Sequence, residues 1–339
     1  MKQEIDCVIL WVDGNEQKWK NKKEYYLPKN DNGKIDADED RYRDWGTLRY
    51  LFRGIAKFAP WFRYIFLISD EQIPEWLNLK NSKIKVVDHK KFIPEKYLPT
   101  FSSHTIELNL HRIKELSEYF VYFNDDMFII KETMPDYFFK KNLPCDSAIM
   151  NAFAIKKSDK DFRFLMPINN IEIINAHFNK GNVIKKYFWK FYNYKYGRDL
   201  LRTFCLTPWK HFTGFTINHM PYSLCKSTFE KIWNLEFKIM DRTCSHRFRN
   251  SSDVNIWLIQ YWQYAEGNFY PREIKSGALM SISDSEEETL KTCNIVKNQK
   301  CKICCINDNL QNRKKFEKMK NMILQAFEHI LPEKSEFEL

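Results

Sequence analysis

Two adjacent carboxylates, Asp125 and Asp126, interrupt an otherwise apolar and aromatic run from Phe120 to Ile130. Such a run predicts a buried strand in the middle of a sheet. Because an unpaired buried charge is very costly, we expect the pair where the strand ends and the chain emerges. Ligands bind at this end of the strands in open α/β sheets, and carboxylate oxygens there suit Mg²⁺ or Mn²⁺ carrying a diphosphate. The alternative is that both aspartates only cap a turn, which is the commoner role of a bare Asp-Asp pair.

A second group of reactive side chains precedes this strand. Ser103, Glu107 and His111 recur every four residues, and either Ser102 or Ser103 suits the N-cap of a helix. A helix would project these three side chains from nearly one face. That face could line a site with a hydroxyl, a carboxylate and an imidazole. The alternative is a solvent-facing stripe that holds an ordinary Glu–His pair.

Asp13 and Gly14 follow a first apolar run, residues 5–12, and begin a turn. A first strand that delivers these two residues to its carboxyl end could contact a nucleotide. Gly14 would then let a phosphate or a base approach the backbone closely. Many strands simply end in Asp-Gly turns, so a structural role is the alternative.

Basic side chains provide candidate phosphate contacts. Arg247 and Arg249 alternate along an extended segment and would face one side of it, which suits oxyanion binding. Arg49 lies on a predicted helix, where it could fork onto phosphate oxygens or belong to a solvated basic face. His219 precedes Met-Pro, and a lone histidine in such a place is normally structural.

Apolar periodicity and turn signals divide the rest of the chain into alternating strands and helices. This alternation predicts an α/β fold with a mostly parallel sheet flanked by helices. We expect strands at 5–12, 64–68, 83–87 and 120–128, and helices within 41–60, 170–196, 254–264 and 316–330. The division we predict is an α/β half at 1–150, a mainly helical insertion at 151–212, a second part of the catalytic domain at 213–312 and a C-terminal helix at 313–339.

The chain carries a formal net charge of +10. Attraction to phosphate-bearing ligands or to an anionic membrane face would account for this charge, as would a solvated surface rich in lysine. No nucleic-acid-binding motif is present, so we expect no nucleic-acid partner. No apolar run reaches the ~18 residues of a membrane span, and the N-terminus lacks the pattern of a secretory signal. We therefore expect a cytoplasmic protein, and we leave open a peripheral contact of the insertion with an acceptor or the inner face of the cell membrane.

Nine cysteines are present, and in a reducing compartment we expect most of them to be free core residues. Four of them cluster near the C-terminal end: Cys293, Cys301, Cys304 and Cys305. Their Cys-x-x-Cys is half of a zinc signature, but the other spacings fit no standard finger. We predict that these cysteines pack in the core, with structural zinc as the alternative.

The candidate residues fall into blocks that follow one another along most of the chain. These blocks are Ile5-Asp6-Cys7-Val8, Trp11-Val12-Asp13-Gly14, Arg43-Asp44, Leu48-Arg49-Tyr50, Phe58-Ala59-Pro60-Trp61, Ile73-Pro74-Glu75-Trp76-Leu77, Pro99-Thr100-Phe101-Ser102-Ser103, Ile106-Glu107, His111-Arg112-Ile113, Tyr122-Phe123-Asn124-Asp125-Asp126, His219-Met220-Pro221-Tyr222, Arg247-Phe248-Arg249 and Ile306-Asn307-Asp308-Asn309. In order and approximate spacing they resemble the Stealth family, which contains bacterial capsular polysaccharide phosphotransferases and the animal lysosomal enzyme N-acetylglucosamine-1-phosphotransferase. The chain departs from the family pattern at Trp45-Gly46 and in the Cys-rich run before Ile306, and residues 156–213 match nothing in it.

The resemblance implies an enzyme that moves a sugar-1-phosphate from a nucleotide sugar, expected to be a UDP-sugar, to a hydroxyl of an acceptor glycan. The product would be a phosphodiester in a capsular or other cell-surface polysaccharide. The implied fold is Rossmann-like or glycosyltransferase-A-like, with the nucleotide sugar bound by residues 1–150. Attack at phosphorus depends on positioning and charge neutralisation more than on covalent chemistry.

Each candidate residue then has an expected role. Asp125 and Asp126 would hold a divalent metal, Mg²⁺ or Mn²⁺, which stabilises the leaving nucleoside monophosphate as a Lewis acid. A base of near-neutral pKa would take the acceptor proton, and we favour His219 over Glu107 and His111. Arg49, Arg249 and Arg247 would clamp phosphate oxygens, and we count Arg247 among the catalytic residues. Asp13 and Gly14 would contact the nucleotide. Ser103 would form a hydrogen bond with the substrate.

Two other functions are compatible with these residues. A metal-dependent glycosyltransferase of related fold would direct the acceptor at the anomeric carbon and release a nucleoside diphosphate. A catalytically inactive carbohydrate-binding protein would bind sugar without turnover and would tolerate the loss of Asp125 or Asp126. Besides the donor and the glycan acceptor, we allow for a second copy of the chain as a partner.

Overall fold

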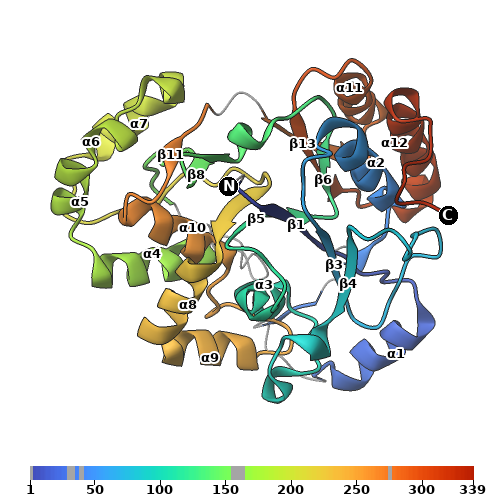
Figure 1. The fold of residues 1–339 in the computed structure, drawn as a ribbon, viewed down its shortest axis with the longest axis horizontal. Coiled ribbons are helices and arrows are strands. Elements are labelled where there is room, and N and C mark those ends of the chain that lie inside the picture. The colour runs from blue at the N-terminus through green and yellow to red at the C-terminus, as the bar shows by residue number, and fades with distance from the viewer. Residues whose placement is uncertain (1–2, 29–34, 38–41, 154–164, 274–276) are drawn as a thin grey trace.

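A five-stranded central sheet organises the fold in a computed structural model that describes residues 3–28, 35–37, 42–153, 165–273 and 277–339 (Figure 1). The strands lie in the order β4 (Ile84–Asp88), β3 (Ile65–Ser69), β1 (Ile5–Leu10), β5 (Tyr119–Asn124) and β9 (Tyr222–Cys225). The first four are parallel to one another, and β9 runs antiparallel to β5. The predicted mostly parallel sheet is therefore confirmed.

The parallel strands are nearly continuous apolar runs because helices cover both faces of the sheet. Val8 of β1 lies beside Phe66 of β3 and Tyr122 of β5, and all three residues are buried. If the four parallel strands are numbered along the chain, they lie side by side in the order 3-2-1-4. The direction of winding therefore reverses between β1 and β5. In doubly wound sheets ligands bind at such a switch point, outside the carboxyl ends of the strands.

The acidic pair lies where the chain passes from the central sheet to a second sheet. β5 ends at Asn124, and β6 (Met127–Ile129) joins a sheet of order β12 (Gly277–Ser283), β13 (Ile303–Asn309), β6. The single strand predicted at 120–128 is wrong, because its apolar residues are buried in two different sheets. The expectation that both aspartates lie at the end of a strand is confirmed.

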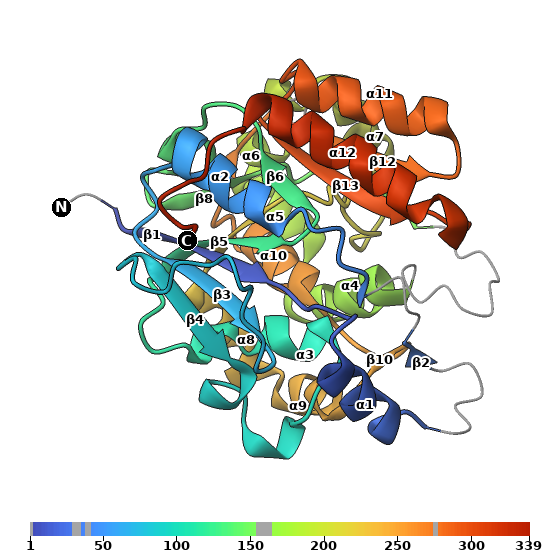
Figure 2. The same ribbon diagram turned by 90° about the vertical axis from the view of Figure 1, so that its right-hand side faces the viewer.

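Helices pack around the two sheets. α2 (Leu48–Phe58), which lies within the helix predicted at 41–60, packs against β6 and buries Leu51, Phe52 and Ile55. α11 (Glu286–Lys297) and α12 (Phe316–Ile330) pack against each other beside β12 and β13, as Figure 2 shows. The other helices outside the insertion include α1 (Gln17–Tyr26), α3 (Ser103–Leu108), α8 (Lys226–Leu235), α9 (Phe237–Ser245) and α10 (Ile256–Ala265).

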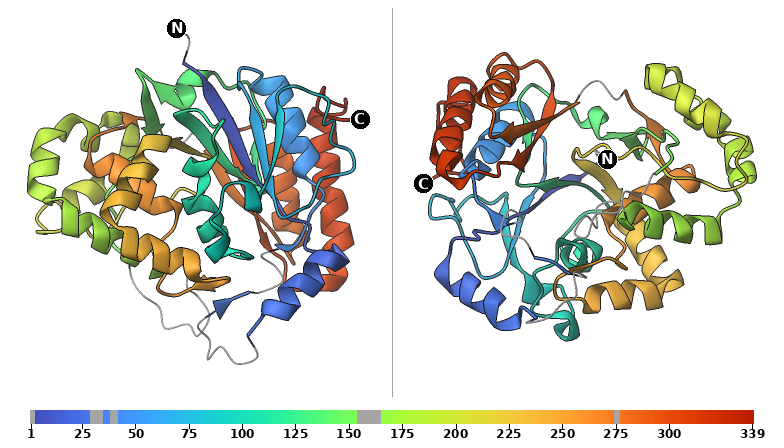
Figure 3. Two further views of the ribbon diagram at one scale, coloured as in Figure 1. Left: turned by 60° about the horizontal axis from the view of Figure 1, so that its bottom comes forward. Right: turned by 180° about the vertical axis from the view of Figure 1, so that it is seen from behind.

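The predicted insertion is mainly helical and lies at the end of the molecule away from α11 and α12 (Figures 1 and 3). Its helices are α4 (Leu165–His177), α5 (Lys180–Lys186), α6 (Phe188–Phe191) and α7 (Leu200–Leu206). α4 packs against α10, and residues 154–164 of the predicted insertion lie outside the described residues. Two small sheets complete the fold. One has the order β11 (Tyr270–Pro271), β8 (Leu143–Asp146), β7 (Phe139–Lys140), and the other pairs β10 (Arg249–Asn250) with β2 (Ile35–Asp36).

The helix predicted to carry Ser103, Glu107 and His111 on one face is shorter than expected. α3 ends at Leu108, and His111 belongs to a separate 3₁₀ turn. The side chain of Asn109 explains this end, because it donates to Thr105 O at 2.8 Å and accepts from Arg112 Nε at 2.8 Å. The prediction of a single shared face is therefore wrong for His111, although Ser103 and Glu107 both belong to α3.

All nine cysteines are free, and the clustered four are buried in the core, in agreement with the packing prediction. Among the helices that the structure describes, none has both the length and the apolar composition needed to cross a membrane.

Candidate active site

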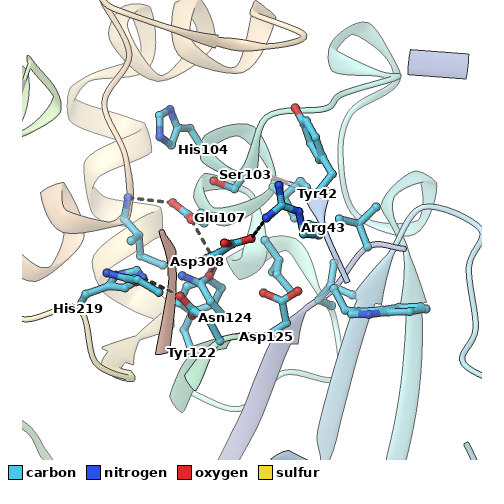
Figure 4. A pocket seen from close by; sticks show the side chains of 18 of the residues that line it. Tyr42, Arg43, Ser103, His104, Glu107, Tyr122, Asn124, Asp125, His219 and Asp308 are labelled. Atoms are coloured by element: carbon cyan, nitrogen blue, oxygen red, sulfur yellow. Dashed lines mark hydrogen bonds and ion pairs between the residues drawn. The ribbon is translucent and has the colours of Figure 1, made fainter. Parts of the chain in front are cut away.

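A cavity of about 530 Å³ opens at the carboxyl ends of β1 and β5, at the switch point of the sheet. Its walls come from these strand ends, from residues 42–48, from α3 and from the end of β13 (Figure 4). Polar side chains from segments far apart in the sequence therefore face one space. They include Asp44, Ser103, Glu107, Asn124, Asp125, Asp126, His219, Arg249, Asn307 and Asp308.

Negative charge gathers at the turn formed by Asp125 and Asp126, which we call the acidic turn. Burial, and then the charges of Asp126 and Asp44, raise the pKa of Asp125 to about 8. Asp126 Oδ1 is buried and has no hydrogen-bond partner among the described residues. Such an oxygen is costly to bury unless a cation or a donor reaches it. The acidic turn is thus suited to a positively charged ligand.

The second carboxylate oxygen of Asp126 has two close neighbours. Oδ2 lies 3.4 Å from His219 Nε2 and 3.3 Å from Cys305 Sγ. Within the described part of the chain, Asp126, His219 and Cys305 are the one group of metal-ligating side chains whose ligand atoms lie within 4.8 Å of one another. These residues make the acidic turn the best candidate metal centre that the described residues offer.

The donor atoms at the acidic turn favour a hard cation. Burial, and next the charge of Asp126, hold the pKa of the Cys305 thiol well above its usual range, so the sulfur stays protonated. A thiol in this state is a poor metal ligand, because thiolates are the ligands that zinc selects. The oxygens of Asp125 and Asp126, with an imidazole beside them, fit Mg²⁺ or Mn²⁺ instead.

An ion pair between Arg43 and Asp308 joins distant parts of the chain at the cavity. Arg43 Nη1 lies 2.7 Å from Asp308 Oδ2, and Trp45 Nε1 donates to the same oxygen at 3.1 Å. Both charged side chains are largely buried, so water screens their attraction only weakly. The pair holds the end of β13 against the segment that carries Asp44, on the side of the cavity away from His219 (Figure 4).

Glu107 is buried, and both of its carboxylate oxygens are engaged. Tyr122 Oη lies 3.1 Å from Glu107 Oε1, and the N–H of Ile256 donates to Oε2 at 3.4 Å. Ile256 begins α10, where backbone N–H groups lack helical partners and the helix dipole favours negative charge. Glu107 therefore braces α3 against β5 and α10, and to accept a proton it would have to give up one of these contacts.

A relay of side chains orients the imidazole of His219. Trp257 Nε1 donates to Tyr222 Oη at 2.8 Å, and this oxygen lies 3.4 Å from His219 Nδ1. The other ring nitrogen, Nε2, faces Asp126. One nitrogen thus serves to orient the ring, while the other is presented to the cavity for chemistry.

Arg249 brings positive charge to the cavity. Its Nη2 donates to Ser103 Oγ at 2.9 Å, so the hydroxyl of α3 positions the guanidinium. Arg249 forms no ion pair with any carboxylate of the described residues. A guanidinium with donors to spare, beside a hydroxyl, suits the oxygens of a phosphate group.

Asp13 and Gly14 do not line the cavity, although Val12 does. The Asp13 carboxylate accepts the N–H of Asn15 at 2.8 Å and so caps its own turn. A Cβ at Gly14 would lie 2.0 Å from Tyr42 O, so the lack of a side chain lets the 42–44 segment approach closely. Gly14 therefore supports the cavity wall that carries Arg43 and Asp44.

Arg49, Arg247 and His111 also lie outside the cavity lining. The guanidinium of Arg49 lies 5.8 Å from the ring centre of Trp76, and that of Arg247 lies 4.8 Å from the ring centre of Tyr26. His111 stacks on an aromatic ring in the core, and burial lowers the pKa of its imidazole to about 3. The structure accounts for these three side chains through packing.

Six of the predicted site residues meet in the cavity: Ser103, Glu107, Asp125, Asp126, His219 and Arg249. Sequence reasoning assigned no role to Asp44 or Asp308, which the structure places beside them. A signal for Asp308 was present, because a polar Asn-Asp-Asn follows an apolar strand there just as the acidic turn follows β5. The expectation that polar residues gather at strand ends could have been applied to both places.

Comparison with known proteins now identifies the family. Two family models match the chain: Stealth protein conserved region 2, at residues 41–146, and Stealth protein conserved region 3, at residues 218–266. The exopolysaccharide phosphotransferase cps2G of Lactiplantibacillus plantarum is 42% identical over 99% of this chain and 96% of that relative. The chain belongs to the Stealth family. In this Stealth protein, region 2 supplies the acidic turn to the cavity, and region 3 supplies His219 and Arg249.

Further relatives cover the whole length of this Stealth protein. The capsular polysaccharide phosphotransferase WcwK of Streptococcus pneumoniae is 40% identical over 99% of this chain and 98% of that relative. The receptor polysaccharide phosphotransferase WefC of Streptococcus gordonii is 37% identical over 100% of both chains. Among solved structures, the apo form of mouse xyloside xylosyltransferase 1 matches with a TM-score of 0.33 and 11% identity, covering 89% of this chain and 97% of that one.

Proposed function

We propose that this Stealth protein transfers a sugar-1-phosphate from a nucleotide sugar to a hydroxyl of an acceptor glycan during synthesis of a capsular or other cell-surface polysaccharide. Phosphotransferase relatives that match nearly the whole chain support this activity. The observation that carries the proposal is the acidic turn at the switch point, where Asp126 keeps a buried carboxylate oxygen without a partner. A divalent cation that arrives with a diphosphate donor would supply the positive charge that this turn lacks.

The donor diphosphate would lie across the carboxyl ends of β1 and β5. Arg249 would bind phosphate oxygens, with Ser103 holding its guanidinium in place. Asp125 and Asp126 would hold Mg²⁺ or Mn²⁺, which neutralises charge on the diphosphate and on the leaving group when it is bound. Asp44 lies close enough to add to this negative field.

The transfer forms a bond between the acceptor hydroxyl oxygen and the phosphorus next to the sugar, and it breaks the bond from that phosphorus to the nucleoside monophosphate. We assign His219 as the base that takes the hydroxyl proton, because Nε2 faces the cavity and Tyr222 orients the ring from the other side. Positioning and charge neutralisation carry the rest of the reaction.

Our proposal takes a UDP-hexose as the donor and the cytoplasm as the compartment. The nine free cysteines support a reducing environment, because disulfides rarely persist there. The guanidinium of Arg249 suits the phosphate oxygens of a diphosphate, and the acidic turn suits the divalent cation that accompanies it. Together they support a diphosphate-bearing donor.

Analysis of the released nucleotide tests this function. The purified protein, incubated with a panel of UDP-sugars, divalent cation and a capsular acceptor, should release UMP in step with formation of a phosphodiester. Ion-exchange chromatography separates UMP from UDP. Release of UDP without UMP would contradict the proposal, because the acceptor would then have attacked the anomeric carbon as in a glycosyltransferase. Tight sugar binding with no nucleotide release from any donor would instead support an inactive carbohydrate-binding protein.

A further inference from the structure

Positive charge is concentrated in one part of the helical insertion. Residues 180–211 contain eight lysines and arginines against a single acidic residue, Asp199, so they carry +7 of the net charge of +10. Lys185, Lys186, Arg202 and Lys210 are exposed. A cluster of this density is a strong electrostatic feature, and the cavity at the acidic turn does not include any of its residues.

The same segment exposes large apolar side chains. Trp189 is 77% exposed, Leu201 67% and Trp209 56%, and Phe204 also exposes more than half of its surface. Together with Phe188 and Tyr194, these residues form what we call the insertion surface. A scattered exposed apolar residue needs no explanation, but six within 22 consecutive residues indicate a surface that something else covers.

Ring contacts make the core of this surface continuous. Trp189 meets Phe188 with ring centres 5.1 Å apart, Phe188 stacks on Tyr192 at 4.6 Å, and Tyr192 meets Phe204 at 4.9 Å. Leu201 lies three residues before Phe204 on α7 and so shares its helix face. The ring contacts therefore join Trp189, Phe188 and Phe204 into one patch. The helices α6 and α7 lie at the outer end of the molecule, away from α11 and α12 (Figures 1 and 3).

Two inward-facing lysines hold this patch in place. Lys180 Nζ donates to the carbonyl oxygens of Leu206 and Trp209 at 2.6 and 2.8 Å, which ties the end of α7 to the start of α5. Lys190 Nζ donates to the carbonyl oxygens of Gly267 and Phe269 at 2.6 and 2.9 Å, which ties α6 to the rest of the chain. The insertion surface is thus presented by a fixed framework and is not a frayed end.

We propose that the insertion surface docks on an anionic lipid membrane. Aromatic side chains gather at membrane interfaces, and basic residues beside them are attracted to acidic headgroups. A second copy of the chain is disfavoured as the occupant, because the exposed lysines and arginines around this surface would repel those of the other copy. A glycan is also disfavoured, since Leu201 offers no ring for a sugar to stack on, whereas a hydrocarbon boundary suits every member of the patch. This inference does not depend on the proposed transferase activity.

Vesicle co-sedimentation tests the docking surface with the full-length protein. The wild type should bind vesicles of phosphatidylcholine with phosphatidylglycerol at least about tenfold more tightly than vesicles of phosphatidylcholine alone, and added salt should weaken the binding. Replacing Trp189 and Phe204 by serine should weaken binding to the anionic vesicles by about tenfold or more, because each ring loses its burial in the interface. Replacing Lys185 and Lys186 by glutamate should remove the preference for the anionic vesicles.

A matched control separates this surface from general stickiness. The double variant Leu79→Ser with Leu290→Ser removes side chains that are 54% and 49% exposed elsewhere, and it should bind as the wild type does. All variants should melt near the wild-type temperature, because the replaced groups are exposed. Equal binding of the wild type to both vesicle types, or unchanged binding of the Trp189→Ser, Phe204→Ser variant, would overturn the proposal. The proposal would also be overturned if the wild type bound no vesicles but formed a dimer or was retained on capsular glycan, and if the Trp189→Ser, Phe204→Ser variant lost that association.

Discussion

Replacing Asp125 by asparagine should lower kcat/KM for sugar-phosphate transfer by about 10³-fold, which corresponds to about 4 kcal/mol of transition-state stabilisation. The side chain keeps its shape but can no longer ionise to hold a cation at the acidic turn, where Asp126 and Asp44 lie close to it. Initial rates of nucleotide release at saturating divalent cation measure the effect. Glu230→Gln is the matched control, because it removes a charge from an exposed position on α8 and should keep the wild-type rate.

The same Asp125→Asn variant should be more stable than the wild type at pH 8 in metal-free buffer. An aspartate titrates near ~3.9 in an unfolded chain, whereas the pKa of Asp125 in the folded chain is raised to about 8 by burial and by Asp126 and Asp44. A raised pKa means that the folded state is favoured while the carboxyl is protonated. This contribution is full below about pH 4 and is lost as the pH rises towards 8.

Asparagine does not ionise, so the variant avoids this loss. Melting temperatures in the presence of a chelator should therefore show the variant several degrees above the wild type at pH 8, with the difference closing near about pH 4. Lower activity with higher stability is the expected signature of a strained functional group. A variant that is both inactive and less stable at pH 8 would show that Asp125 serves the fold and would remove it from the site.

Replacing His219 by glutamine should lower kcat by about 10² to 10⁴-fold while leaving KM for the donor nearly unchanged. Glutamine can keep a hydrogen bond to Tyr222, which lies 3.4 Å from His219 Nδ1, but it cannot accept the acceptor proton. Steady-state rates at varied donor concentration measure kcat and KM, with the exposed His329→Gln as a control that should behave as the wild type.

His219 also lies 3.4 Å from Asp126, so a role as a metal ligand predicts a different result. A lost ligand would raise the concentration of divalent cation needed for half-maximal rate, and excess cation would restore the rate. A lost base would leave that concentration unchanged, and excess cation would not help. Restoration by excess cation would therefore contradict the assignment of His219 as the base.

The elements that position the site could be predicted from the sequence where local apolar patterns and the cost of burying charge determine the structure. The apolar runs of β1 and β5 identify buried parallel strands, and the cost of burying charge places Asp125 and Asp126 at a strand end. The passage from one sheet to another could not be seen, because residues on both sides of the acidic turn are equally apolar. The periodicity of an apolar run does not indicate which sheet its residues join.

Other features depend on tertiary contacts. Arg43 and Asp308 form their ion pair across 265 positions of sequence, and no local pattern links them. The end of α3 follows from two side-chain hydrogen bonds of Asn109, whereas helical spacing alone would continue the helix to His111. The resemblance to the Stealth family selected the blocks that matter, but only the structure separates residues that face the cavity from those, such as Gly14, that support its wall.

Electron paramagnetic resonance of Mn²⁺ titrated into the metal-free protein in the presence of UDP is the most direct test of the acidic turn. We predict that the wild type and Glu230→Gln each bind a single Mn²⁺, and that Asp126→Asn loses this binding, because the substitution removes the charge from the carboxylate whose buried oxygen lacks a partner. Equal Mn²⁺ binding by the wild type and Asp126→Asn would contradict the assignment of the metal centre to this turn.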